Sequence, residues 1–206
     1  MALIGFLLSV AFISLSGVMM PGPVFAVTVA KGHRSPYAGA LVAIGHGIIE
    51  FPLMFLVYFG LAGFLKLPAV QAAIGIVGGA MLVWMGYGMI RSPQEQTANA
   101  NPQAHLGPVA AGAVTTGANP YFLLWWATVG ALLISRSLAF GLTGFLLLTV
   151  THWLCDLGWD TLVSFATYHS RRLWTPLVHR IVFTVCGLTL AGFGIYFAVS
   201  AVLGAV

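Results

Sequence analysis

The chain has 206 residues, of which 60% are hydrophobic and only 6% are charged, and its mean hydropathy is +1.00. A soluble domain carries about 25% charged residues, so this composition excludes a water-soluble globular protein and predicts one that has the bilayer as its solvent. The chain has eight Lys and Arg residues and four acidic residues, and most of the basic residues lie in short segments between apolar runs. The basic balance therefore indicates membrane orientation and no nucleic-acid partner.

Apolar windows of membrane-spanning length follow one another along the chain. They cover residues 3–30, 37–64, 69–90, 107–134, 138–165 and 180–204. The first window lacks a basic leading segment and a clear cleavage site, so we expect a retained span and no signal peptide. The pattern predicts an all-α integral membrane protein with six transmembrane helices. A five-span alternative arises if the first run re-enters the membrane at Pro21.

Two of these windows contain helix breakers. In Met20-Pro21-Gly22-Pro23, the prolines remove two backbone donors and clash with carbonyls one turn back, while Gly22 tolerates the dihedral angles that a break needs. In the fourth window, Asn119-Pro120 repeats the pattern, with Asn119 placed to cap the restarting helix or to touch a ligand. A restarting helix exposes N–H groups and a positive dipole end, which favour an anion such as a carboxylate. A plain kink is the alternative reading.

Two other windows carry a histidine and a carboxylate on one helix face. His46 and Glu50 are four residues apart, and so are His152 and Asp156, with Asp160 one turn further on. An ionised carboxylate near the bilayer centre costs roughly 2.5–3.5 kcal/mol on insertion scales, so an intramembrane acid indicates a functional site. Histidine–carboxylate pairs can also serve a purely structural role between helices, and Asp160 could lie in the hydrated interface.

These features recur in order along the two halves of the chain. The polar stretch 91–108 connects a first three-helix unit, residues 1–90, with a second, residues 109–206. Because each unit has an odd number of spans, the sequence predicts two inverted repeats with helices 1 and 4 broken, as in many secondary transporters. Loops after the odd spans hold Lys31, Arg34, Arg91, Arg171, Arg172 and Arg180, against Lys66 and Arg136 opposite. This bias predicts both termini outside the cytoplasmic membrane.

Other conspicuous residues are better explained by packing. The four tryptophans near the polar positions are expected to be interfacial anchors or packing residues; they are Trp125, Trp126, Trp153 and Trp159. Gly75-xxx-Gly79 predicts a close helix–helix approach, within the fold or in a homodimer. Cys155 and Cys186 are expected to be buried packing residues, since no CxxC pattern is present.

Taken together, the residues resemble the LysE/RhtB superfamily of amino-acid exporters over nearly the whole chain. The resemblance is carried by the early PGP, the Gly-His-xxx-Glu of the second span, the Asn-Pro of the fourth span and the His-Trp-xx-Asp of the fifth. It implies ion-driven efflux of an amino acid or related metabolite, with matching positions at Pro21, Gly22, Pro23, Asn119, Pro120 and Asp156. The family often has a lysine after Asn-Pro, where this chain has Tyr121, which indicates a divergent branch.

The resulting hypothesis is a proton antiporter without a cofactor. Pro21, Gly22, Pro23, Asn119, Pro120 and Tyr121 would bind the substrate, and Glu50 and Asp156 would exchange protons for its amino group. His46 and His152 would relay protons, and Asp160 would be an access group near the cytoplasm.

Three alternatives use the same residues differently. A divalent-metal exporter would use the histidine and carboxylate set as ligands, although the helix breaks suit an anionic group better. An intramembrane enzyme has no HExxH, GxSxG or cysteine pair to support it. A scaffold without a substrate leaves the intramembrane carboxylates unexplained.

Overall fold

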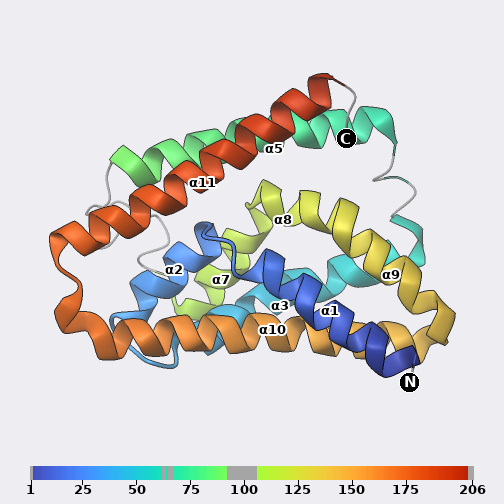
Figure 1. Cartoon of the computed structure of the whole chain (residues 1–206), viewed down its shortest axis with the longest axis horizontal. Coiled ribbons are helices and arrows are strands. Elements are labelled where there is room, and N and C mark those ends of the chain that lie inside the picture. Colours follow the sequence, from blue (N-terminus) through green and yellow to red (C-terminus); the bar gives the residue numbers. More distant parts are fainter. Residues whose placement is uncertain (1, 62–63, 65–66, 92–105, 204–206) are drawn as a thin grey trace.

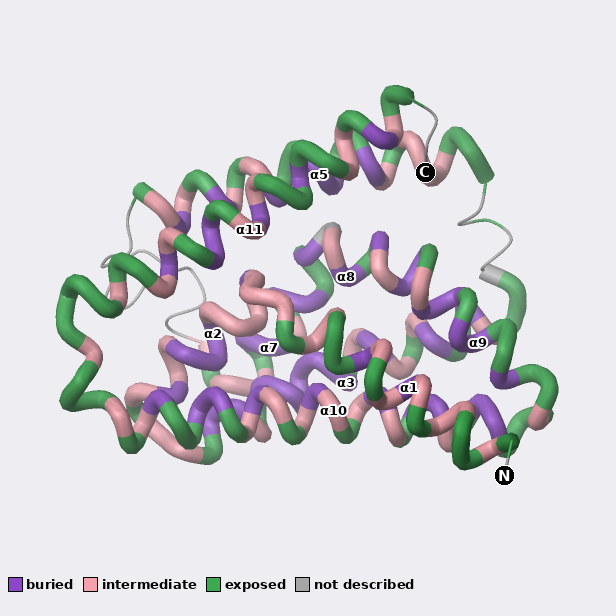
Figure 2. The backbone as a smooth tube through the Cα atoms, in the orientation of Figure 1, coloured by how far each residue is buried: buried purple, intermediate pink, exposed green. Residues whose placement is uncertain are grey.

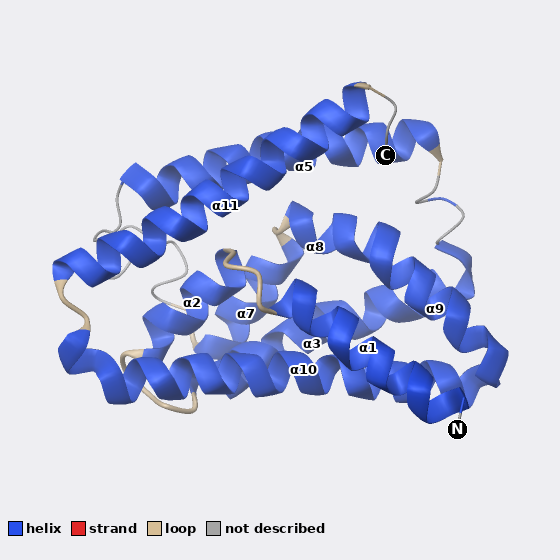
Figure 3. Cartoon of the chain, viewed as in Figure 1, coloured by secondary structure: helices blue, strands red, loops and turns tan. Residues whose placement is uncertain are grey.

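A computed structural model describes residues 2–61, 64, 67–91 and 106–203, and all regular secondary structure in these ranges is helical (Figures 1 and 3). The elements of the first half are α1 (Ala2–Val18), α2 (Pro23–Gly32), α3 (Ala38–Leu56), the π-helical η1 (Val57–Leu61) and α5 (Pro68–Arg91). Those of the second half are α7 (Pro108–Gly117), α8 (Pro120–Trp125), the π-helical η2 (Trp126–Gly130), α9 (Ala131–Ser137), the 3-10 turn η3 (Leu138–Phe140), α10 (Gly141–Ser170), the 3-10 turn η4 (Arg171–Leu173) and α11 (Pro176–Val202). The predicted connector, residues 91–108, lies mostly outside the described residues.

Both predicted breakers interrupt a helix. The axes of α1 and α2 meet at 78°, and Pro23 is the first residue of α2. Gly22 takes an extended conformation as the N-cap, and its carbonyl accepts the first helical bond from the Ala26 amide. In the second half, α7 ends at Gly117 and α8 restarts at Pro120, with proline again at the first helical position, where its missing N–H costs nothing.

The α5 and α11 helices form an antiparallel pair along one side of the molecule, while α10 lies along the opposite side (Figure 1). Glycines bring the two helices together: a Cβ added to Gly79 would lie 2.5 Å from the Gly194 carbonyl oxygen, and one added to Gly75 would lie 2.6 Å from the Ala201 Cβ. The Gly75-xxx-Gly79 motif therefore serves packing inside the chain. Val29, Leu82, Phe183 and Leu190 belong to an apolar core that joins this pair to α2 and α10.

Glycines also bring the helices that carry the polar residues into close contact. Gly45 of α3 packs on the Val109 carbonyl of α7, and Gly112 of α7 packs on the Val42 carbonyl of α3. Gly39 of α3 likewise lies against the Asp160 carbonyl of α10. A side chain at any of these glycines would separate the helices, so Gly39 sets the distance between α3 and α10, and Gly45 and Gly112 set the distance between α3 and α7.

The outer surface has the character of a lipid-facing surface. Many large apolar side chains are exposed on the outer faces of the helices, among them Trp84, Leu142, Leu162 and Leu188, whereas buried residues line the helix contacts (Figure 2). By length and apolar composition, four helical stretches can cross a membrane, namely Ala38–Gly60, Pro68–Arg91, Tyr121–Leu173 and Pro176–Val202. The bent pair α1–α2 passes the same test when its two helices are taken together. The chain is thus an all-helical, multi-pass membrane protein.

Within the described residues, most Lys and Arg side chains lie at one end of the molecule. The C-terminal ends of α2, α5 and α10 and the start of α11 lie at one end, and the start of α1 and the end of α11 lie at the other (Figure 1). The first end carries Lys31, Arg34, Arg91, Arg171, Arg172 and Arg180 on or beside these segments. Arg136, in the last turn of α9, belongs to the other end. The basic residues that the sequence assigns to one side of the membrane are therefore grouped in space.

Candidate functional site

A cavity of about 80 Å³ lies between the two helix breaks. Gly22 and Pro23 line it at the start of α2, Asn119 and Tyr121 line it at the start of α8, and Leu190 of α11 closes another part of the wall. All three acidic residues that the structure describes, Glu50, Asp156 and Asp160, also line it. None of the described Lys and Arg residues does. The cavity therefore places acids beside two helix N-termini.

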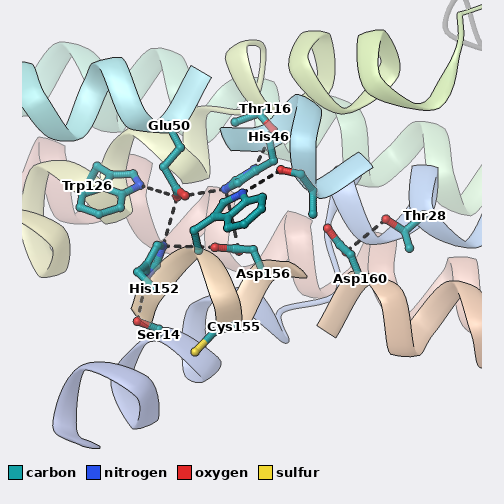
Figure 4. Close-up of polar contacts among 12 residues, drawn as sticks. Ser14, Thr28, His46, Glu50, Thr116, Trp126, His152, Cys155, Asp156 and Asp160 are labelled. Carbon is teal, nitrogen blue, oxygen red and sulfur yellow. Dashed lines mark hydrogen bonds and ion pairs between the residues drawn. The ribbon is translucent and has the colours of Figure 1, made fainter. Parts of the chain in front are cut away.

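Glu50 is the centre of the polar cluster. It is completely buried, and its Oε1 atom accepts hydrogen bonds from three nitrogens (Figure 4). These are Nε2 of His46 at 3.0 Å, Nε2 of His152 at 3.1 Å and the indole Nε1 of Trp126 at 3.3 Å. The predicted histidine–glutamate pair on α3 and the histidine of α10 thus share one carboxylate oxygen. Charge-assisted bonds of this kind are each worth about 1.5–3 kcal/mol.

Asp156 approaches the same Nε2 atoms of the two imidazoles as Glu50 does, but it is less tightly held. Its Oδ1 is 3.8 Å from His46 Nε2, and its Oδ2 is 3.5 Å from His152 Nε2. Neither Glu50 Oε2 nor Asp156 Oδ2 accepts a hydrogen bond from any described residue, although both atoms are buried. Buried acceptors are normally satisfied, and an orphan costs about 1–3 kcal/mol. The two oxygens are therefore free to accept from a ligand or a proton.

The remaining ring nitrogens bind hydroxyl groups from the segments that precede the two breaks. His152 Nδ1 is 2.7 Å from Ser14 Oγ of α1, and His46 Nδ1 is 2.8 Å from Thr116 Oγ1 of α7. Both hydroxyl residues are fully buried. Sequence reasoning missed these contacts because Ser14 carries no local motif, and Thr116, although it begins the predicted break segment 116–120, lies far from His46 in the chain.

Asp160 is separate from the central cluster but faces the same cavity. Its Oδ1 accepts a hydrogen bond of 3.1 Å from Thr28 of α2, and only 4% of the residue is exposed (Figure 4). The expectation that Asp160 could lie in the hydrated interface is therefore wrong, because α2 folds across it after the first break. Thr28 thereby attaches the restarted helix to α10.

The tryptophans divide by environment. Trp126 is 1% exposed, so packing is the correct interpretation and interfacial anchoring is not, but its bond to Glu50 was not predicted. Trp125 lines the cavity and stacks on the His152 ring at a centroid distance of 5.1 Å. Trp153 donates to the Ala43 carbonyl at 3.1 Å and so joins α10 to α3. Of the two cysteines, Cys186 is buried as expected, whereas Cys155 is only partly buried.

The other predicted substrate contacts depend on backbone geometry. Asn119 is the N-cap of α8, and its Oδ1 accepts from the Tyr121 amide at 3.1 Å, which confirms the predicted capping role. The Tyr121 ring packs on Phe193 and Phe197 of α11 and borders the cavity. Pro21 is not among the residues that line the cavity and acts through the bend. Pro120 begins α8.

Comparisons with known proteins point to one class. A family model described as LysE type translocator matches residues 15–201. The putative amino acid efflux protein YcgF of Bacillus subtilis (strain 168) is 24% identical over 181 residues, which cover 85% of this chain and 87% of that protein. The threonine efflux protein of Escherichia coli (strain K12) is 27% identical over 213 residues, covering 94% and 97%. That of Salmonella typhimurium is 26% identical over 209 residues, covering 93% and 97%. No solved structure matches.

The matched range includes both helix breaks and every acid and histidine of the cavity. These features are the ones on which the sequence-based resemblance depended, and the match confirms it. The relatives named above are described as efflux proteins, and the matching family is one of translocators. By the extent of the family match, this chain belongs to the LysE-type translocator family of membrane proteins.

Proposed function

We propose that the chain exports a small amino acid, or a related metabolite with an amino group, in exchange for protons across the cytoplasmic membrane. The observation that carries the proposal is the pair of buried carboxylate oxygens without a hydrogen-bond partner, Glu50 Oε2 and Asp156 Oδ2, in a cavity that none of the described Lys and Arg residues lines. An ammonium group can donate hydrogen bonds to both oxygens, and its positive charge balances the negative charge of the carboxylates. The names of the amino acid and threonine efflux relatives support the same class of substrate.

The substrate carboxylate would lie at the restarted helices. Gly22, Val24 and Phe25 of the first break and Tyr121 of the second line the cavity. The first turn of α2 has no side-chain cap, so its N–H groups and positive dipole end favour an anion, whereas at the start of α8 the Tyr121 amide already donates to Asn119. A zwitterion would thus lie with its amino group toward the acids and its carboxylate toward the breaks, as in other half-helix sites. Pro21 and Pro120 would keep both helices broken.

Protons and the amino group would compete for the same oxygens. Glu50 and Asp156 can each hold a proton, and a protonated imidazole, whose Nε2 faces both acids, can give its proton to either of them. A substrate ammonium that binds these carboxylates displaces the protons, and protons that return displace the substrate. Asp160, held by Thr28 beside the cavity, would deliver or accept protons on the side where the bases are grouped. No cofactor is needed in this scheme.

The architecture that suits alternating access is an inverted repeat. We propose that residues 1–90 and 109–206 are the two repeats and that the chain crosses the membrane six times. The continuous stretch Tyr121–Leu173 has 53 residues. At a rise of 1.5 Å per residue, it would be about 80 Å long, far beyond a bilayer core of about 30 Å. The left-handed backbone at Gly141, with φ of 63°, allows it to turn back into a second crossing. The grouped bases favour a cytoplasmic location for their end and an outside location for both termini.

Transport by purified protein in proteoliposomes tests the proposal. An imposed pH gradient should drive the movement of labelled threonine, which the relatives' names make the first substrate to try. We expect Glu50→Gln and Asp156→Asn to abolish gradient-driven transport, with Glu50→Asp, which keeps the charge, as the matched control for loss of the carboxylate. Unchanged gradient-driven transport in both neutral variants would overturn the proposal.

A divalent-metal exporter remains the alternative to exclude. One ligand atom each from His46, Glu50 and Asp156 lies within 4.8 Å of the others. The relatives named above are amino acid and threonine efflux proteins, however, and the alternative finds no support in the comparisons. Thermal stabilisation with a panel of amino acids against a panel of divalent metals separates the two, because only a ligand that binds the folded protein raises its melting temperature. Stabilisation by metals alone would contradict amino-acid export.

A further inference from the structure

Each imidazole of the cluster contacts at least one group from the other half of the chain. His152 of the second half contacts Glu50 and Ser14 of the first, and His46 of the first half contacts Thr116 of the second. The two hydroxyl contacts, at 2.7 and 2.8 Å, are as short as strong side-chain hydrogen bonds. Both hydroxyl residues are 0% exposed, so water does not replace either contact.

We propose that Ser14 and Thr116 are positioning residues that hold His152 and His46 in the tautomer with hydrogen on Nε2. An ionised Glu50 can only accept, so a neutral imidazole must present N–H to it from Nε2. The other nitrogen, Nδ1, then has a bare lone pair. A hydroxyl that donates to this lone pair stabilises that tautomer, and the opposite tautomer would leave Glu50 facing a second acceptor.

A hydroxyl is suited to this place because it can act in two ways. When the ring gains a second proton, Nδ1–H donates to the hydroxyl oxygen, and the hydroxyl hydrogen can turn to a carbonyl one turn back in its own helix. A carbonyl could only accept, and an amide N–H could only donate. The rings can therefore change charge without losing a partner. The described charged groups that face them are Glu50 and Asp156, with Asp160 farther away.

The arrangement also links each helix break to the opposite half. Ser14 belongs to α1, which ends just before the first bend, and Thr116 lies in the last turn of α7 before the second. A movement of either helix end would shift the hydroxyl and release the ring nitrogen. The position of each helix end and the tautomer of the histidine that it contacts are thus coupled through one hydrogen bond.

The test compares Ser14→Ala and Thr116→Val with the conservative variants Ser14→Thr and Thr116→Ser. Matched controls are Ser137→Ala and Thr149→Val, since those buried hydroxyls bond only to carbonyls of their own helix, Ile134 and Phe145. Histidine ¹⁵N NMR spectra of the full chain in lipid nanodiscs report the tautomer, with signals assigned from His46→Gln and His152→Gln. Labelled-threonine transport in proteoliposomes is measured in parallel.

We expect the native spectra to have Nε2–H on both rings. Ser14→Ala should give a mixture of tautomers for His152 alone, and Thr116→Val should give one for His46 alone. Each of these two variants should transport about tenfold more slowly. The conservative variants should restore the native spectra and transport, and the control variants should leave both unchanged. A native Nδ1–H tautomer, or unchanged spectra in Ser14→Ala and Thr116→Val, would overturn the inference. The transport readout depends on the proposed function, but the spectra do not. If the spectra show the expected tautomers but the protein does not transport amino acids, only the proposed function is refuted. If Glu50→Gln abolishes transport but Ser14→Ala and Thr116→Val leave the tautomers unaltered, only this inference is refuted.

Discussion

The packing of α5 against α11 can be tested with a single methyl group. In Gly79→Ala, the new Cβ would lie 2.5 Å from the Gly194 carbonyl oxygen and 3.0 Å from the Ala198 Cβ, both on α11. Ordinary contacts of this kind begin near 3.4 Å, and a backbone carbonyl cannot rotate away. The two helices must therefore separate locally by roughly 1 Å, a gap that forfeits a quarter to a half of the dispersion energy of the contacts it opens.

Overpacking of this kind costs about 1–3 kcal/mol of unfolding free energy. For a chain of this length, it should lower the melting temperature by about 2–12 °C in detergent. Gly88→Ala on the same helix is the control, because its Cβ would meet no atom within 4 Å and alanine favours a helix. Equal melting temperatures for Gly79→Ala and the wild type, or an equal loss in Gly88→Ala, would refute the packing account.

Two further variants test individual contacts of the site. Trp126→Phe keeps an aromatic ring against His152 but removes the N–H that donates to Glu50, so we expect a loss of about 1.5–3 kcal/mol in unfolding free energy and about tenfold slower transport. Trp84→Phe, on an exposed position of α5, is its control, and equal behaviour of the two variants would contradict the assigned bond. Asn119→Ala should cost about 1 kcal/mol because the Tyr121 amide loses its cap, with recovery in Asn119→Ser. Melting curves check both, and an Asn119→Ala protein as stable as the wild type would show that the cap is dispensable.

The sequence predicted the features of the fold that local chemistry determines. Proline next to Gly22 and next to Asn119 located both breaks without coordinates, whereas the isolated Pro52 lies inside α3. The four-residue spacing of His46 with Glu50 and of His152 with Asp156 required each pair to share a helix face. Gly75 and Gly79 indicated a close helix approach, but only the structure shows that α11 is the partner.

The contacts that sequence reasoning missed depend on how separate helices meet. Ser14 and Thr28 are ordinary residues of apolar helices. Thr116 and Trp126 were noticed, as part of the second break and as a tryptophan near the polar positions, but nothing in the sequence named their hydrogen-bond partners. Each becomes a hydrogen-bond partner of the cluster only because the helix that carries it packs against α3 or α10. The same reason explains the error on Asp160, whose burial by α2 depends on the angle of the first bend. A buried carboxylate in an apolar span must find donors, but the pattern does not name them.

Competition between protons and an amino group for Glu50 and Asp156 is tested most directly by counting the protons released when substrate binds. Titration calorimetry of the purified chain with threonine, repeated in buffers that differ in ionisation enthalpy, measures that number. We predict that binding releases protons, that affinity weakens as the pH is lowered, and that Glu50→Gln removes most of the release. Tight binding with a heat that is the same in every buffer would mean that no proton leaves these carboxylates, and it would contradict the exchange described here.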